Sequence, residues 1–170
     1  KNAFTNCGNL ASVEIPEGVT IIEDETFRDC DSLANVILPN TITSIGRGAF
    51  YECINLTHIS IPESVTSVAP GAFAYCTALC SVEWNAKNHT DIYSDQKAPF
   101  YSISSQITSF VFGNTVESIP SYLCCGMSAL DSIVIPNSIN SIGDYAFEGC
   151  SSLTTVNIPN SATTIGSRAL

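Results

Sequence analysis

The chain has 170 residues, of which 45% are hydrophobic and only 13% are charged, so it carries ample apolar material for a buried core. Its 16 acidic and 6 basic side chains give a formal net charge of −10. Because phosphate contacts need clustered Lys and Arg, we expect no nucleic-acid partner. Two uncharged stretches, 64–82 and 98–116, are interrupted by Pro, Gly and small polar residues, so we expect no membrane-spanning helix.

The ends of the chain show no initiator Met, no apolar leader and no closing segment. We therefore expect residues 1–170 to form a single domain that is a fragment of a longer protein.

A repeat of 23 residues runs along the whole chain. Its clearest mark is a Phe that follows a small residue, at Phe4, Phe27, Phe50, Phe73 and Phe147. Counting back from Phe147 in steps of 23 reaches Cys124 and then Tyr101. This register predicts about seven repeats with a five-residue insertion within 84–100.

Each repeat begins with a Leu-x-x-Val-x-Ile segment, in which apolar and polar residues alternate. Alternation with a period of two predicts a short strand that buries one of its faces. These strands are expected at 10–15, 33–38, 56–61, 79–84, 107–112, 130–135 and 153–158. Pro follows five of the strands and ends the ladder there, because Pro has no N–H to donate.

A second extended segment of the Val-Thr-x-Ile type follows in most repeats. These segments end at Ile22, Ile45, Val68, Ile119, Ile142 and Ile165. Gly residues such as Gly48 and Gly71 then permit the turn that leads to the next Phe.

One repeat cannot fold alone, because its few large apolar side chains do not offset the entropy of ordering 23 residues. Stacked repeats share hydrogen bonds and cover each other's apolar flanks. The sequence therefore predicts a repeat solenoid.

The segments LTHISIPESVTSVAPGAFAYCTAL (56–79) and LDSIVIPNSINSIGDYAFEGCSSL (130–153) resemble the BspA-type leucine-rich repeat. The resemblance covers the whole chain except 84–100 and, more loosely, 120–127. It implies a right-handed leucine-rich-repeat superhelix of short strands, turns and short helical segments. It also implies a secreted or cell-surface protein of a bacterium. Studied members of the family are linked to adhesion and to host matrix proteins such as fibronectin and fibrinogen.

Five of the eight Cys stand three residues after the Phe column, at Cys7, Cys30, Cys53, Cys76 and Cys150. Ser104 and Met127 fill the same position in this register, so the position favours a small apolar filler. We interpret the column as buried, reduced thiols, with one or two disulfides or a bound metal as the alternatives. The other Cys lack the paired C-x-x-C spacing of a zinc site, so no metal site is predicted.

Motifs for catalysis or for a cofactor are absent from the sequence, including the nucleophile elbow, the zinc-protease helix, the phosphate loop and the dinucleotide fingerprint. Carboxylates such as Glu14 and Glu83 fall three turns apart, which is ~14 Å at one strand spacing per turn. That separation exceeds the one used by glycosidases. We expect no enzymatic activity and no cofactor.

The second and fourth residues after each strand Leu point away from the predicted core, and we call them the strand face. Its central members are Asn35, Ile37, His58, Ser60, Ser81, Glu83, Ser109, Val111, Ser132 and Val134. They are small, polar and nearly uncharged, with an apolar pair at Val111 and Val134. A flat, wide sheet face of this kind suits protein recognition, although Ser and Thr could also serve only to keep a sheet soluble.

The insert at 84–100 is a second candidate, because insertions in repeats form loops and loops often carry contacts. Its candidate binding residues are Lys87, His89, Tyr93 and Lys97. A tolerated length variant without a role is the alternative.

Together these features predict a non-catalytic module that binds an extracellular protein, such as a host matrix protein, through the strand face. The alternative is a purely structural spacer or stalk. Neither end of the chain looks like a polar cap, so we also expect frayed ends or end-to-end self-association.

Overall fold

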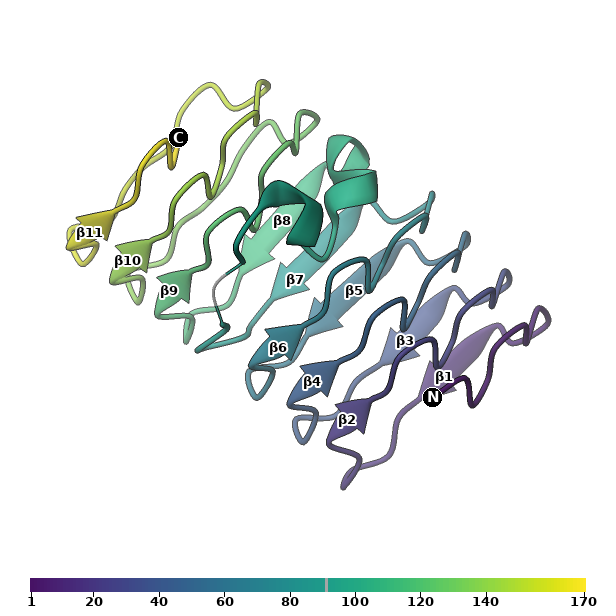
Figure 1. Cartoon of the computed structure of the whole chain (residues 1–170). Helices are drawn as coiled ribbons and strands as arrows, with labels where there is room; N and C mark the ends of the chain where they lie inside the picture. The colour runs from purple at the N-terminus through teal and green to yellow at the C-terminus, as the bar shows by residue number, and fades with distance from the viewer. Residues whose placement is uncertain (91) are drawn as a thin grey trace.

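The computed structural model describes residues 1–90 and 92–170, so Asp91 of the predicted insert lies outside the described residues. The chain winds into a β-solenoid of about seven turns, with the two termini at opposite ends of the stack (Figure 1). Helical structure in the described residues is confined to two 3-10 helices, η1 (Asp95–Lys97) and η2 (Tyr101–Gln106). The predicted leucine-rich-repeat solenoid of short strands and turns is thereby confirmed.

The Leu-x-x-Val-x-Ile segments form one side of the solenoid. Their strands are β1 (Ser12–Glu14), β3 (Asn35–Ile37), β5 (His58–Ile61), β7 (Ser81–Trp84) and β8 (Ser109–Phe112). Parallel pairing keeps the 23-residue step, for example between Ile59 and Val82. The pairing also continues across the insertion, since Val82 pairs with Phe110 even though extra residues lie between them.

The second extended segments form the opposite side, which faces the viewer in Figure 1. Their strands are β2 (Ile21–Ile22), β4 (Ser44–Ile45), β6 (Ser67–Val68), β9 (Ser118–Ile119), β10 (Ser141–Ile142) and β11 (Thr164–Ile165). They form two parallel sheets, β2-β4-β6 and β9-β10-β11, which the insert separates.

The Phe column is a stack of parallel rings at the third corner of the turn. Neighbouring rings from Phe4 to Phe73 lie 5.2–5.4 Å apart, with interplanar angles of 10° or less. Glycines with left-handed backbone enter this corner, with φ of 58° at Gly48 and 66° at Gly71. The predicted turn glycines therefore occupy a conformation that other residues adopt at a cost.

At the first corner after the insert the predicted Phe column is wrong by one residue, whereas the strand columns on either side keep the predicted register. Phe100, not Tyr101, continues the stack, with its ring 5.2 Å from that of Phe73. Phe100 is buried whereas Tyr101 is exposed. In the same way Ile103, not Ser104, is the buried residue three positions later. The helix η2 begins at Tyr101 and absorbs the extra residue between this corner and the next strand.

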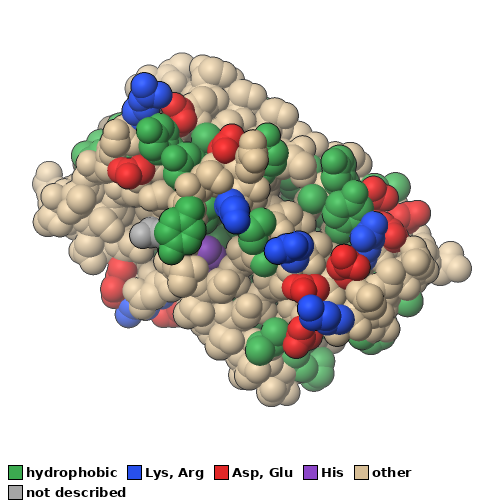
Figure 2. All heavy atoms as spheres, in the orientation of Figure 1, with side chains coloured by type: hydrophobic (Ala, Val, Ile, Leu, Met, Phe, Trp, Pro, Cys, Tyr) green, Lys and Arg blue, Asp and Glu red, His purple; other side chains and the backbone are tan. Residues whose placement is uncertain are grey.

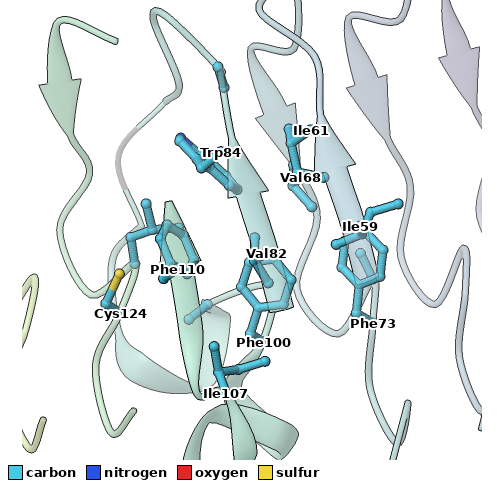
Figure 3. Close-up of a cluster of buried hydrophobic side chains, with 14 of the residues drawn as sticks. Ile59, Ile61, Val68, Phe73, Val82, Trp84, Phe100, Ile107, Phe110 and Cys124 are labelled. Atoms are coloured by element: carbon cyan, nitrogen blue, oxygen red, sulfur yellow. The ribbon is translucent and has the colours of Figure 1, made fainter. Parts of the chain in front are cut away.

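The core is a single apolar cluster that runs the length of the stack, and none of its buried members among residues 1–90 and 92–170 is polar or charged. At its centre, Trp84 and Phe110 are larger than the Val, Leu or Ile that most other turns carry at the same inward-facing strand positions (Figure 3). No helix in the described part of the chain is long and apolar enough to cross a membrane.

Replacing a Phe inside the stack should destabilise the chain far more than replacing the one at its end. Phe50 is fully buried between two rings, so Phe50→Ala should cost about 3–5 kcal/mol in the free energy of unfolding. Phe4 is 46% exposed and stacks on one side only, so Phe4→Ala should cost about 1–2 kcal/mol. Urea unfolding followed by circular dichroism measures both, and equal losses would contradict the account.

Both end faces leave core columns uncovered, as expected from the lack of polar caps. Phe4 at one end and Ile165 and Leu170 at the other are about half exposed. We predict that the 170-residue chain associates end to end, because a second copy would cover these side chains. Light scattering should therefore give a mass that rises with protein concentration. A constant mass of 18.1 kDa would count against this prediction.

Candidate functional site

The strand face is built by parallel pairing, which places equivalent residues of successive turns side by side. His58, Ser81 and Ser109 form one row, and Ser60, Glu83 and Val111 form the next. The first row is linked by a contact of 3.3 Å between His58 Nδ1 and Ser81 Oγ. Asn35 and Ile37 lie on β3, and Ser132 and Val134 lie in the turn that follows β8.

Three large aliphatic side chains of the strand face are exposed to solvent. Val134 is 80% exposed, Val111 is 55% exposed and Ile37 is 50% exposed. Exposed aliphatic side chains cost solubility and contribute nothing to the core. Their presence on one face therefore fits a surface that another molecule covers.

The strand face is not the flat continuous sheet that the sequence predicted. Its ladder divides into β1-β3, β5-β7-β8 and an isolated bridge between Val134 and Asn157. A cleft of about 950 Å³ opens between β8 and residues 132–138. A smaller hollow of about 560 Å³ lies at the break between β3 and β5, where its lining includes Asn35, Ile37 and His58.

Both openings are lined by two residues that the sequence reasoning missed, Asn85 and Asn114. Asn85 and Gly113 occupy the position at which five other turns carry Pro, and their N–H groups extend the ladder to Ile61 O and Trp84 O. A Cβ at Gly113 would meet the Asn85 side chain, which would have to move aside. The missing Pro was the sequence signal that marked this part of the face.

The insert residues make different contacts from one another. Lys87 Nζ lies 3.0 Å from Glu117 Oε1, and this hydrogen bond raises the pKa of Lys87. His89 accepts the Val68 N–H at Nε2, faces Thr90 O through Nδ1 and lies against the Trp84 ring. Because Nε2 accepts and Nδ1 faces a carbonyl, the proton of neutral His89 is on Nδ1.

Tyr93 and Lys97 of the insert are both exposed, and Lys97 lies in η1. The insert lies on the side of β2, β4 and β6, where charged side chains of both signs gather in Figure 2. The strand face lies on the other side of the solenoid (Figure 1). The structure therefore does not bring the two predicted sets of residues together into one site.

The thiols of the Cys column are structural groups. All eight Cys are free, and the Sγ atoms of Cys30, Cys53, Cys76 and Cys150 each donate a hydrogen bond to a carbonyl oxygen of the turn before. Burial raises the pKa of the Cys76 thiol to about 12 and that of Cys150 to about 11. A thiol that stays protonated is a poor nucleophile and a poor metal ligand.

Metal ligands do not gather anywhere in the described residues: no group of three or more His, Cys, Asp or Glu could hold an ion there. In the part of the chain that the structure describes, His58 has a hydrogen-bonding contact with Ser81 alone, and neither residue is buried. The geometry of the strand face thus offers hydrogen bonds and apolar contacts rather than reactive groups.

Comparison with known proteins places the chain in a family. The family model for the BspA-type leucine-rich repeat region matches residues 1–126 and 96–170, with six copies of the repeat. The chain therefore belongs to the BspA-type leucine-rich repeat family, as its columns predicted. No curated protein matches the sequence.

Several solved bacterial leucine-rich-repeat structures resemble the chain. A leucine-rich repeat protein from Eubacterium ventriosum is 29% identical, with a TM-score of 0.75 over 94% of this chain and 42% of the other. The T. pallidum leucine-rich repeat protein is 25% identical, with a TM-score of 0.57 over 98% of this chain and 64% of the other. A leucine-rich cell surface protein from Faecalibacterium prausnitzii is 28% identical, with a TM-score of 0.52 over 99% of this chain and 53% of the other. The chain thus spans between about two fifths and two thirds of the length of these relatives.

The buried thiols should make the fold sensitive to alkali. In the unfolded chain a thiol ionises near pH 9.0, whereas burial holds Cys76 protonated to about pH 12. The folded state therefore keeps protons that the unfolded state releases, and the free energy of unfolding falls as pH rises above 9. Each such thiol contributes a slope of up to ~1.4 kcal/mol per pH unit.

Urea unfolding between pH 8 and 11 measures this slope. A Cys53→Ala/Cys76→Ala variant should be less stable than the parent chain at pH 8 but should lose stability less steeply above pH 9. Parallel curves for the two proteins would show that these thiols do not carry the effect.

Proposed function

We propose that the chain is a non-catalytic protein-binding module of a secreted or cell-surface bacterial protein, and that its strand face recognises an extracellular protein. The observation that carries the proposal is the group of exposed aliphatic residues, Ile37, Val111 and Val134, on a face with little charge. Burial of apolar surface is the dominant favourable contribution in most protein–protein association. The two openings beside them give the face a shape that a partner can fill.

Membership of the family supports the location. One of the similar structures is described as a cell surface protein, and the resemblance of the repeats implies binding of host matrix proteins. We propose fibronectin and fibrinogen as the first ligands to test. We also propose that residues 1–170 act as one domain within this role.

The strongest test is binding of the immobilised chain to fibronectin and fibrinogen, with serum albumin as the control ligand. Val111→Ser/Val134→Ser should weaken binding by about tenfold or more, because two aliphatic contacts are lost at the interface. Both side chains are exposed, so circular dichroism and unfolding should stay close to those of the parent chain.

Ile21→Ser provides the matched control, since Ile21 is 50% exposed but belongs to β2 on the opposite side. This variant should bind like the parent chain. Equal losses in the two variants would contradict a site on the strand face. No binding above that of albumin would favour the spacer as the function of these repeats.

A further inference from the structure

Two neighbouring turns are joined on one side of the solenoid and open on the other. β9 pairs with β10 through Ser118–Ser141 and Ile119–Ile142, and Cys124 N–H donates to Ala146 O at 2.9 Å at the Phe corner. On the strand face the same two turns carry β8 and residues 132–135, which do not pair. The cleft of about 950 Å³ is this opening, with β8 along one wall and residues 132–138 along the other.

The walls of the cleft carry backbone groups that pair in other turns. Ser109 N–H donates to Cys80 O at 3.1 Å, and Ile15 N–H donates to Ile37 O at 3.0 Å. Within the described residues, the equivalent bonds from Ser132 N–H to Thr108 O and from Phe112 N–H to Val134 O are absent.

The last ladder bond is ruled out by covalent structure. In β8 the Gly113 N–H donates to Trp84 O at 2.9 Å. The equivalent residue in the next turn is Pro136, which has no N–H, so Phe112 O has no ladder donor. The opening thus leaves donors and acceptors of one strand edge facing those of another.

Aromatic side chains lie on the core side of this junction. Phe110 and Phe112 fill inner strand positions that hold Val, Leu or Ile in most other turns, and their rings lie 5.1 Å apart. Phe112 also reaches the ring of Phe147 in the following turn, edge-on at 6.4 Å.

We propose that an extended peptide segment of a partner protein binds in this cleft as an added strand, with its backbone paired to β8 on one side and to residues 132–135 on the other. An extended chain is the occupant that satisfies both walls at once, because each wall presents backbone groups at the spacing of a β-strand. The inference rests on the proposed function, since it names how the strand face would hold its partner.

The lining of the cleft also selects side chains. Val111 and Val134 stand at the cleft and favour aliphatic residues in the segment. Glu83 is the one charged residue among the cleft's described lining, and it belongs to none of the ion pairs found in residues 1–90 and 92–170. In a chain with a net charge of −10, this carboxylate favours a Lys or Arg in the segment.

The test uses a blocked peptide, Thr-Val-Lys-Val-Thr, and the ¹⁵N-labelled chain. Before the peptide is added, the Ser132 and Val134 amides should exchange with solvent at least about tenfold faster than the amide of Gly143, which donates to Ile119 O across the same two turns. The peptide should cause saturable shifts in residues 108–113 and 132–136 and should slow exchange of the Ser132 and Val134 amides. Protection of these amides in the free chain would overturn the proposal, because the ladder would then be closed.

Two control peptides separate strand addition from other binding. The same sequence with N-methyl groups on alternate residues keeps its side chains but loses backbone donors, and it should bind at least about tenfold more weakly. A Glu in place of the Lys should weaken binding in the parent chain, and this difference should shrink in Glu83→Gln. Equal affinity of the N-methylated peptide, or an absence of shifts in the cleft, would overturn the proposal.

The peptide experiment and the matrix-protein experiment can fail independently of each other. If fibronectin or fibrinogen binds and Val111→Ser/Val134→Ser abolishes it while the cleft amides stay unprotected, a folded surface covers the strand face and strand addition is wrong. If the peptide protects the cleft amides but neither matrix protein binds, strand addition stands and the matrix-protein proposal fails.

Discussion

Each turn of this solenoid is held by the turn next to it, through backbone hydrogen bonds that run along the stack. The Phe corner shows the pattern clearly, with Phe27 N–H bonded to Ala49 O at 2.8 Å and Phe50 N–H bonded to Ala72 O at 2.9 Å. Since every such bond joins positions about one repeat apart, the 23-residue step is a condition of folding. An extra residue must leave the ladder, and the chain places its extra residues in the insert with η1 and η2.

In one turn of the solenoid the aromatic residues stand in the strand rather than at the Phe corner. Cys124 stands where other turns place the ring of a Phe, and its N–H bond to Ala146 O confirms that it occupies that corner. In the same turn Phe110 and Phe112 replace aliphatic residues of the strand, and Phe110 lies in the same part of the core as Cys124 in Figure 3. Aromatic volume has therefore moved from the corner to the strand. The strand-face ladder ends in this same turn, at β8.

The columns of the sequence predicted the fold because each depends on one residue type at one period. Position in the repeat placed Val111 and Val134 on the outside despite their apolar side chains, and both are exposed there. The break in the ladder was not predictable in this way, because residues 130–135 match the columns of the repeat whether or not their backbone pairs with β8. The choice between Phe100 and Tyr101 also could not be made from spacing, since adjacent aromatic residues both fit the column and only the position of η2 decides between them.

The breaks in the strand face also have a mechanical consequence. Bonds between turns lie along the solenoid axis, so tension along that axis loads one junction at a time rather than all junctions in parallel. The junctions between β3 and β5 and beyond β8 lack strand-face pairs among the described residues. They depend on the opposite side and on the Phe corner, as in the pairing of β9 with β10. A stretched chain would therefore lengthen first at these two places, while the β5-β7-β8 block between them stays folded.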